Sequence, residues 1–242
     1  GGWIWEDPNN LDDISAIIHQ SVERSVDDAQ AKNWSERLKQ TEIAQPSICL
    51  SSLLWMRLLD HLGIKPVVVG GHSLGELTAF HAAGAFDERA LSQLAAVRGQ
   101  SMAAGRGERG LMASLACPLD KAERILEKVS GNAVIANING PRQIVISGSQ
   151  PAIHEALRLA AREGVTTRTL EVSNGFHSDL VSAAAEVLRA SAPIPTRLGP
   201  IQNPVISGMK KAVITPGLDL RDPFGNQILS HVDFVSLVRP MS

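Results

Sequence analysis

Residues 66–77 read Pro-Val-Val-Val-Gly-Gly-His-Ser-Leu-Gly-Glu-Leu, and this stretch decides the fold. A β-branched run of this kind is typical of a buried strand in a parallel sheet, and two glycines end it. Because a helix is expected next, at about 75–84, Gly71-His72-Ser73-Leu74-Gly75 places a G-x-S-x-G motif at a strand-to-helix turn. Such a turn projects the serine hydroxyl above the sheet. We predict an α/β fold with Ser73 as nucleophile; the alternative is an ordinary glycine-rich turn whose serine caps the helix.

The surroundings of this turn fit the same prediction. Glycines on both flanks of Ser73 are expected to let strand and helix approach without collision, and the Leu74 N–H at the helix start can point at an oxyanion. Three further helices are expected, at 12–27 with Asp12 as cap, at 45–62 with Pro46 in its first turn, and at 87–104 with Asp87 as cap.

The middle of the chain has a different pattern. Residues 111–172 predict the order β-α-β-β-α-β, which is the split motif of ferredoxin-like folds. We therefore expect a ferredoxin-like small subdomain inserted into a large subdomain made of residues 1–110 and 173–242. The expected strands are 111–117, 133–138, 143–147 and 165–172, the expected helices are 119–129 and 150–163, and Asn139-Gly140-Pro141 is the expected turn.

Composition excludes several classes of protein. The 242 residues are 44% apolar and 20% charged, with a net charge of −2, so neither a nucleic-acid partner nor a membrane partner is expected. Cys49 and Cys117 lie far apart, which argues against a metal site or disulfide and favours a reducing cytoplasm. The two ends, Gly1-Gly2 and Arg239-Pro240-Met241-Ser242, favour a domain that belongs to a larger polypeptide.

Arg98 is the most informative charged residue. Leu91, Leu94, Ala95 and Met102 lie at helical spacing from it, so an arginine occupies the apolar face of its own helix. Burying a guanidinium without an anion is costly, and a carboxylate ligand would be gripped by two parallel hydrogen bonds. A structural salt bridge or a side chain that reaches solvent remains the alternative.

A nucleophilic serine needs a base, and histidine is the usual one. His177 follows an expected strand and a Ser173-Asn174-Gly175 turn, from which it could reach across a cleft. His72 adjoins Ser73, but neighbouring residues of a strand point to opposite faces. The remaining histidines within or at the ends of expected helices fit structural or solvated roles: His19, His61, His81 and His154.

Several motifs in one order resemble the malonyl-CoA:acyl carrier protein acyltransferase family, which includes the acyltransferase domains of polyketide and fatty acid synthases. They are Gln45-Pro46, Val69 to Leu77, Ala95-Ala96-Val97-Arg98-Gly99, Asn139-Gly140-Pro141, Ile146-Ser147-Gly148, Phe176-His177-Ser178 and Gln227 to Phe234. The resemblance implies an α/β-hydrolase-like large subdomain with a ferredoxin-like small one. The string from Gly71 to Ala79, together with Asn174-Gly175-Phe176-His177-Ser178, also resembles the acyltransferase domains of iterative synthases, such as the enediyne or polyunsaturated fatty acid types.

The resemblance implies a reaction and a site. Malonyl would pass from malonyl-CoA through Ser73 to the phosphopantetheine thiol of an acyl carrier protein, with His177 as base and Arg98 binding the malonyl carboxylate. No metal or tightly bound redox cofactor is implied, and the partners would be the carrier protein and the flanking domains of a synthase. A backbone carbonyl near Gln227 would orient His177 in place of an aspartate.

Three residues have both a plain and a family interpretation. Gln45 either caps a helix or lies near the acyl group, and Gln227 is either a surface residue or a neighbour of the histidine. Phe176 is either core or a wall of the acyl pocket. The family also supplies half of its oxyanion hole from a Gly-Gln-Gly motif that residues 1–11 do not contain.

Two other functions compete with acyl transfer. A hydrolase of the lipase or thioesterase type shares the turn, but it usually has the chain order Ser, Asp/Glu, His and often an HGGG-type motif, which is absent. The aspartates between Ser73 and His177 that could serve as the acidic member are Asp87 and Asp120, and both lie at expected helix starts. An inactive docking module is the third possibility, and the intact serine, histidine and arginine argue against it.

Overall fold

The computed structural model describes residues 28–104, 110–170, 175–190, 194–195, 197–208, 212–214 and 216–239. The chain divides into two compact units, residues 1–38 and 39–242. In the first unit, helix α2 spans Asp28–Leu38, and the helix predicted at 12–27 with its cap Asp12 lies outside the described residues. None of the described helices is both long enough and apolar enough to cross a membrane.

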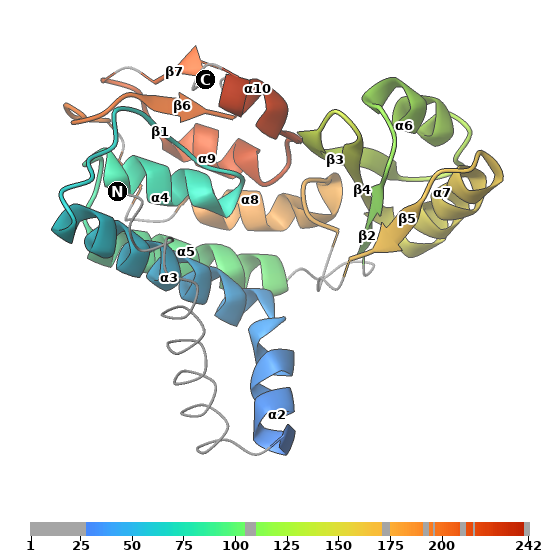
Figure 1. Ribbon diagram of the computed structural model, residues 1–242, viewed down its shortest axis with the longest axis horizontal. Coiled ribbons are helices and arrows are strands. Elements are labelled where there is room, and N and C mark those ends of the chain that lie inside the picture. The colour runs from blue at the N-terminus through green and yellow to red at the C-terminus, as the bar shows by residue number, and fades with distance from the viewer. Residues whose placement is uncertain are drawn as a thin grey trace, which may run out of the picture. The chain divides into compact units, whose positions relative to one another are not determined.

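Helices and a three-stranded sheet make up the part of the second unit that carries the G-x-S-x-G turn (Figure 1). The sheet has the order β1-β6-β7, in which β1 and β6 are parallel and β6 and β7 are antiparallel. The strands are β1 (Val69–Gly70), β6 (Val205–Ser207) and β7 (Ala212–Val213). The helices are α3 (Thr41–His61), α4 (Leu74–Ala82), α5 (Glu88–Ala103), the 3-10 helix η2 (Asp179–Val181), α8 (Ser182–Arg189) and α9 (Arg221–Gln227).

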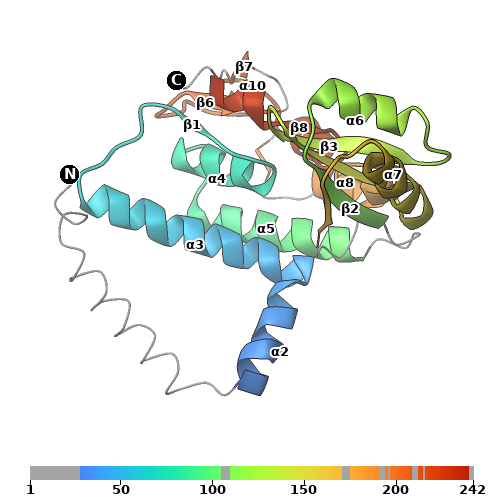
Figure 2. The ribbon, with the colours of Figure 1, turned by 45° about the vertical axis from the view of Figure 1, so that its right-hand side comes forward.

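Helices α3 and α5 lie side by side along most of their lengths (Figures 1 and 2). The close contact depends on Gly99, because a Cβ there would lie 2.8 Å from the Thr41 carbonyl oxygen. Helix α3 begins at Thr41, so the predicted start at residue 45 was wrong and Pro46 lies inside the helix. The extra turn forms because Gln40 O accepts hydrogen bonds from both Ile43 N and Ala44 N.

The strand predicted at 66–69 is shorter than expected. Only Val69 and Gly70 pair with β6, and Val67 is 86% exposed. Within the described residues β6 is the only strand that pairs with β1. The β-branched run therefore has no ladder partner along its first residues. By contrast, Asp87 caps α5 as predicted, because its carboxylate accepts a hydrogen bond from Ala90 N at 2.7 Å.

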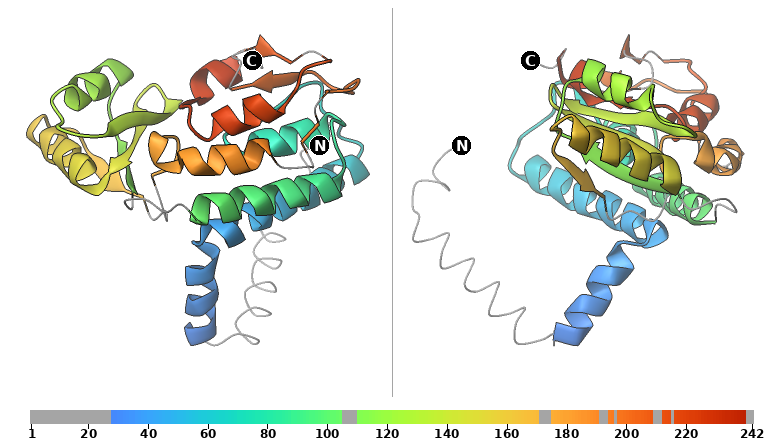
Figure 3. Two further views of the ribbon diagram at one scale, coloured as in Figure 1. Left: turned by 180° about the vertical axis from the view of Figure 1, so that it is seen from behind. Right: turned by 90° about the vertical axis from the view of Figure 1, so that its right-hand side faces the viewer.

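A five-stranded sheet forms the other part of the unit, with order β5-β2-β4-β3-β8 (Figure 3). Residues 110–169 follow the predicted order β-α-β-β-α-β. Within the sheet, β5, β2, β4 and β3 pair with one another in antiparallel fashion. The elements are β2 (Gly110–Leu115), α6 (Leu119–Leu126), β3 (Ala133–Gly140), β4 (Gln143–Ser149), α7 (Gln150–Arg162) and β5 (Thr167–Thr169).

The fifth strand, β8 (Val232–Asp233), comes from the C-terminal region and pairs in parallel with Asn137 and Ile138 of β3. It leads directly into helix α10 (Phe234–Val238), which Asp233 caps through Ser236 N. The sheet of the middle segment is thus completed by residues from the range predicted for the large subdomain. This strand ties the sheet to the C-terminal segment that follows Gln227.

Candidate active site

Ser73 lies at the sharp turn between β1 and α4. Its backbone has φ 51° and ψ −114°, a left-handed conformation that non-glycine residues seldom adopt. Gly71 makes the turn possible, because a Cβ there would lie 2.0 Å from the carbonyl carbon of Gly75. A Cβ on Gly75 itself would meet nothing within 4 Å, so the prediction that both flanking glycines avoid side-chain collisions holds for Gly71 alone.

His177 brings its ring to the serine from the segment before η2. Its Nε2 lies 2.9 Å from Ser73 Oγ. Its Nδ1 faces two backbone carbonyls, at 2.8 Å from Ser230 O and 3.1 Å from Gln227 O. Because carbonyls only accept hydrogen bonds, the proton is assigned to Nδ1, and Nε2 is free to accept from the serine hydroxyl. The His177 backbone also has a positive φ, 57°.

The environment keeps this imidazole neutral. Burial, and next the positive charge of Arg98, lower the pKa of His177 from 6.5 to about 4, while the hydrogen bonds to the Ser230 and Gln227 carbonyls oppose the shift. At neutral pH the ring therefore carries no positive charge and can accept a proton. The base is ready over a wide pH range.

Arg98 reaches the nucleophile from α5. The residue is 3% exposed, so the solvent-reaching alternative is wrong. Its Nη2 donates to Ser73 Oγ at 3.1 Å and lies 3.4 Å from Gln227 Oε1, while its Nη1 donates to Gln45 Oε1 at 2.7 Å. Burial lowers the pKa of Arg98 to about 10, which still leaves the guanidinium charged at neutral pH. A positive charge therefore lies directly beside the serine hydroxyl.

The two glutamines hold the guanidinium rather than capping a helix or facing solvent. Gln45 is 5% exposed in the second turn of α3, where its Nε2 donates to Thr41 Oγ1 at 2.7 Å. Gln227, 3% exposed at the end of α9, donates from Nε2 to Ser73 O at 2.8 Å. The prediction that Gln45 lies at a helix start, and the surface alternative for Gln227, are both wrong.

Leu74 and Phe176 complete the predicted set. Leu74 is the first residue of α4, so its N–H has no acceptor within the helix, whereas the next two N–H groups bond to His72 O and Ser73 O. Phe176 is half-buried and packs against the large core around α4 and α5 and also against a small cluster formed by Met112, Ala136 and Val145. It therefore bridges the two parts of the unit beside His177.

Sequence reasoning missed three contributors to this site. Ser230 supplies the shorter carbonyl contact to His177, and Glu76 with Ser207 lies behind Gln227. His72, which was set aside as the base, has its Nε2 2.8 Å from Asn139 Oδ1 of β3. Of these residues, only Glu76 could be noticed in the sequence. It places a carboxylate in the first turn of the otherwise apolar helix α4, and buried glutamates are rare.

Comparison with known proteins identifies the family. The sequence profile of the acyl transferase domain matches residues 11–206. The chain belongs to the acyl transferase domain family. Among curated acyl transferases, the malonyl CoA-acyl carrier protein transacylase of Bacillus subtilis (strain 168) is 34% identical over 206 residues, which is 83% of this chain and 65% of that protein. A spectinabilin polyketide synthase system protein of Streptomyces orinoci is 34% identical over 179 residues, 74% of this chain and 5% of that protein.

Solved acyl transferase structures resemble the chain as well. The acyltransferase domain of an iterative polyketide synthase in enediyne biosynthesis superposes with a TM-score of 0.77 at 34% identity, covering 84% of this chain and 52% of that one. The MCAT of Streptococcus pneumoniae superposes with a TM-score of 0.76 at 31% identity, covering 86% of this chain and 69% of that one. The mixed α/β fold is thereby confirmed. The chain spans about half to two thirds of these acyltransferases.

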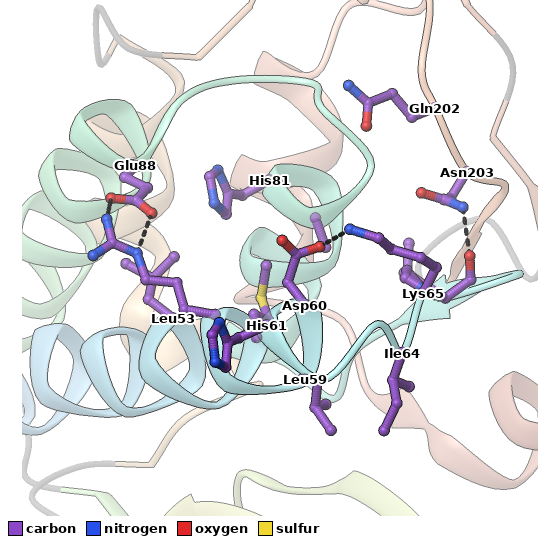
Figure 4. Close-up of a pocket in the computed structure, with 15 residues that line it drawn as sticks. Leu53, Leu59, Asp60, His61, Ile64, Lys65, His81, Glu88, Gln202 and Asn203 are labelled. Carbon is purple, nitrogen blue, oxygen red and sulfur yellow. Dashed lines mark hydrogen bonds and ion pairs between the residues drawn. The ribbon is translucent and has the colours of Figure 1, made fainter.

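Two cavities of the second unit bear on the location of the site. One of about 390 Å³ lies beside the base, lined among others by Val134, Ile135, His177, Ser230 and His231. A larger one, of about 890 Å³, lies between the end of α3, α4 and the start of β6, as Figure 4 shows, and contains none of the candidate residues. Its polar rim is occupied by the pairs Arg57–Glu88 and Lys65–Asp60. We associate the chemistry with the smaller cavity, because His177 lines it.

Proposed function

We propose that this acyl transferase moves a malonyl group from malonyl-CoA to Ser73 and then to the phosphopantetheine thiol of an acyl carrier protein. One observation carries the choice of malonyl: the Arg98 guanidinium lies 3.1 Å from the nucleophilic oxygen. A carboxylate held there must be only a bond or two from the carbonyl under attack, as in malonyl. The name of the Bacillus relative, a malonyl CoA-acyl carrier protein transacylase, supports the same reaction.

The proposed chemistry has two half-reactions. His177 Nε2 takes the hydroxyl proton while Ser73 Oγ attacks the thioester carbonyl, and the tetrahedral intermediate collapses by breaking the C–S bond. The proton passes from His177 to the departing CoA thiolate. The carrier protein's thiol then gives its proton to the same nitrogen, attacks the malonyl-serine ester, and releases the Ser73 hydroxyl. Each half-reaction ends with a neutral imidazole, and the proposed steps call for no metal or redox cofactor.

The developing oxyanion needs hydrogen-bond donors. We assign one of them to the Leu74 N–H, at the positive end of α4. The second donor of the family, the Gly-Gln-Gly glutamine, has no counterpart in residues 1–11, which lie outside the described residues.

Finer features belong to the same proposal. The segment 111–172, whose strands stand in the order β5-β2-β4-β3, is a ferredoxin-like small subdomain, and 1–110 with 173–242 is an α/β-hydrolase-like large one. Phe176 is a wall of the acyl pocket, and Gln45 fixes Arg98 beside it. The domain works within a polyketide or fatty acid synthase in the reducing cytoplasm, where its buried free thiols Cys49 and Cys117 persist.

The hydrolase alternative has no support in this geometry. A Ser-His-Asp hydrolase holds the Nδ1–H of its histidine against a carboxylate. Here the acceptors of His177 Nδ1 are the carbonyls of Gln227 and Ser230. Among the described side chains, no group of three or more histidines, cysteines, aspartates or glutamates could hold a metal ion either.

Intact-mass analysis tests the proposal. After incubation with malonyl-CoA, the wild type should gain the mass of one malonyl group. Ser73→Ala should gain none, although it keeps its fold. An adduct that persists on the Ser73→Ala variant contradicts the nucleophile, and accumulation of free malonate in place of malonyl-carrier protein favours hydrolysis.

A further inference from the structure

Arg98 is a buried cation that no carboxylate of the described residues touches. Its hydrogen-bond acceptors are all neutral, namely the side chains of Gln45, Ser73 and Gln227. Its Nε–H is buried and has no acceptor within the part of the chain that the structure describes. Since an uncompensated charge in a protein interior is strongly destabilising, a counter-charge has to lie close by.

Glu76 is the carboxylate behind these neutral acceptors. It projects from the first turn of α4 and is 2% exposed. One of its oxygens accepts from Gln227 Nε2 at 2.9 Å, and the other accepts from the Ser207 hydroxyl. Cys49 is the other acidic group near Arg98, but burial raises the pKa of its thiol, so it is neutral at physiological pH. Of the two acidic neighbours of Arg98 in the described part of the chain, Glu76 is therefore the source of negative charge.

Gln227 connects the two charges. Its Nε2 donates to both Ser73 O and Glu76 Oε2, so its Oε1 must face Arg98 Nη2. The reverse orientation of the amide would place its oxygen against two other oxygens. A carboxylate at position 76 therefore fixes which end of the amide meets the guanidinium.

We propose that Glu76 is a positioning residue that compensates the charge of Arg98 from one residue away, through the Gln227 amide. In a direct ion pair, a carboxylate of the protein would occupy the hydrogen-bond donors of the guanidinium. The indirect arrangement keeps the cation stable in the empty site and leaves it open to a carboxylate on the acyl group. This second part rests on the proposed malonyl transfer, whereas the charge compensation does not.

A double-mutant cycle on unfolding tests the compensation without any substrate. Glu76→Gln keeps the shape and removes the charge, and Arg98→Met removes the cation. We expect Glu76→Gln to destabilise the wild type and to do so much less in the Arg98→Met background, with a coupling of roughly tenfold in the unfolding equilibrium constant. Urea unfolding of the four proteins gives this number.

The matched control is Glu163→Gln, the same chemical change at a carboxylate that pairs with Lys128 outside this site. Its effect should add to that of Arg98→Met without coupling. If Glu76→Gln fails to fold, recovery of folding in Glu76→Gln/Arg98→Met supports the compensation. Additive effects of Glu76→Gln and Arg98→Met, or failure of the double variant to fold, overturn it.

The choice of acyl group tests the second part. Malonyl brings its own negative charge to Arg98 and acetyl does not, so Glu76→Gln should lose more acetyl loading than malonyl loading. The malonyl-to-acetyl ratio of kcat/KM should therefore rise severalfold above that of the wild type. A role that is only structural would lower both rates equally, and an unchanged or lower ratio contradicts the second part. A wild type that never loads malonyl overturns the proposed function, while the unfolding cycle still decides the coupling.

Discussion

Ser73 and His177 are the only non-glycine residues with positive φ in the described part of the chain. Each such residue costs about 1–3 kcal/mol and persists only where the surroundings enforce it. Here the turn at Gly71 and the hydrogen bond from His177 N to Ile228 O provide that enforcement. At the scale of the residue, backbone strain thus coincides with the pair that we propose to react.

His177→Ala should slow acylation of Ser73 by roughly 10²–10⁴-fold, the usual contribution of a positioned base. In the wild type the rate should stay level from pH 8 down to about 5, since the pKa of His177 is about 4. Stopped-flow release of CoA measures both. A rate that already falls by half near pH 6.5 would mean that the imidazole is not desolvated.

Arg98→Ala should lose malonyl transfer by roughly 10²–10³-fold, because removing one partner of a buried ion pair costs about 3–5 kcal/mol. Acetyl transfer should survive or increase, as acetyl leaves no carboxylate unpaired. Competition between the two CoA thioesters gives the ratio. Full malonyl activity in this variant would assign the guanidinium a purely structural role.

Phe176→Ala should admit methylmalonyl, if the ring is the wall that we propose. One methyl group in a pocket is worth about 1–3 kcal/mol, or roughly 10–200-fold in selectivity. Because Phe176 also packs against both cores, the thermal stability of the Phe176→Ala variant must be measured together with its acyl loading. Equal loading of methylmalonyl and malonyl by the wild type would contradict the wall.

Side-chain chemistry explains which site residues the sequence could predict. Ser73 stands in a local motif, and Arg98 is conspicuous on an apolar helix face, so both are recognisable alone. His177 became the clear choice among seven histidines only through the family resemblance. Ser230 could not be found, because it contributes a backbone carbonyl that any residue type carries.

At the scale of elements, helices were predicted better than strands. The capped helix α5 begins within a residue of its predicted start, because Asp87 provides a local signal. Helix α3 was predicted to start four residues late, since a proline is expected near a helix start and here lies inside. The length of strand β1 was overestimated, because it is set by pairing with β6, which is far away in the sequence.

The turn between β1 and α4 gives a prediction with a built-in control. Gly71→Ala should destabilise the protein severely, since its Cβ would overlap the Gly75 backbone, whereas Gly75→Ala should leave the fold intact because nothing lies within 4 Å. Thermal unfolding followed by circular dichroism compares the two variants. Equal melting temperatures would show that the turn can open to admit a side chain.

At the scale of the whole molecule, stability should depend on pH through His177. The unfolded chain binds a proton near pH 6.5 and the folded chain only near pH 4, so the unfolded state gains protons first as the pH falls. The full contribution of about 3 kcal/mol is present above pH 6.5 and is lost toward pH 4. Urea unfolding of the wild type and His177→Asn at pH 7 and 4.5 should show a smaller pH effect in the variant.

Strand β8 has a consequence for synthesis of the chain. Its partner β3 is made about a hundred residues earlier, and such distant pairings form late. Ser230 and Gln227, whose carbonyls orient the base, precede β8 by only a few residues. A nascent chain that has emerged from the ribosome as far as α8 therefore already contains Ser73 and His177. It still lacks the carbonyls of Gln227 and Ser230 that orient the histidine. The enzyme should therefore be inactive on the ribosome until residues 227–233 have emerged.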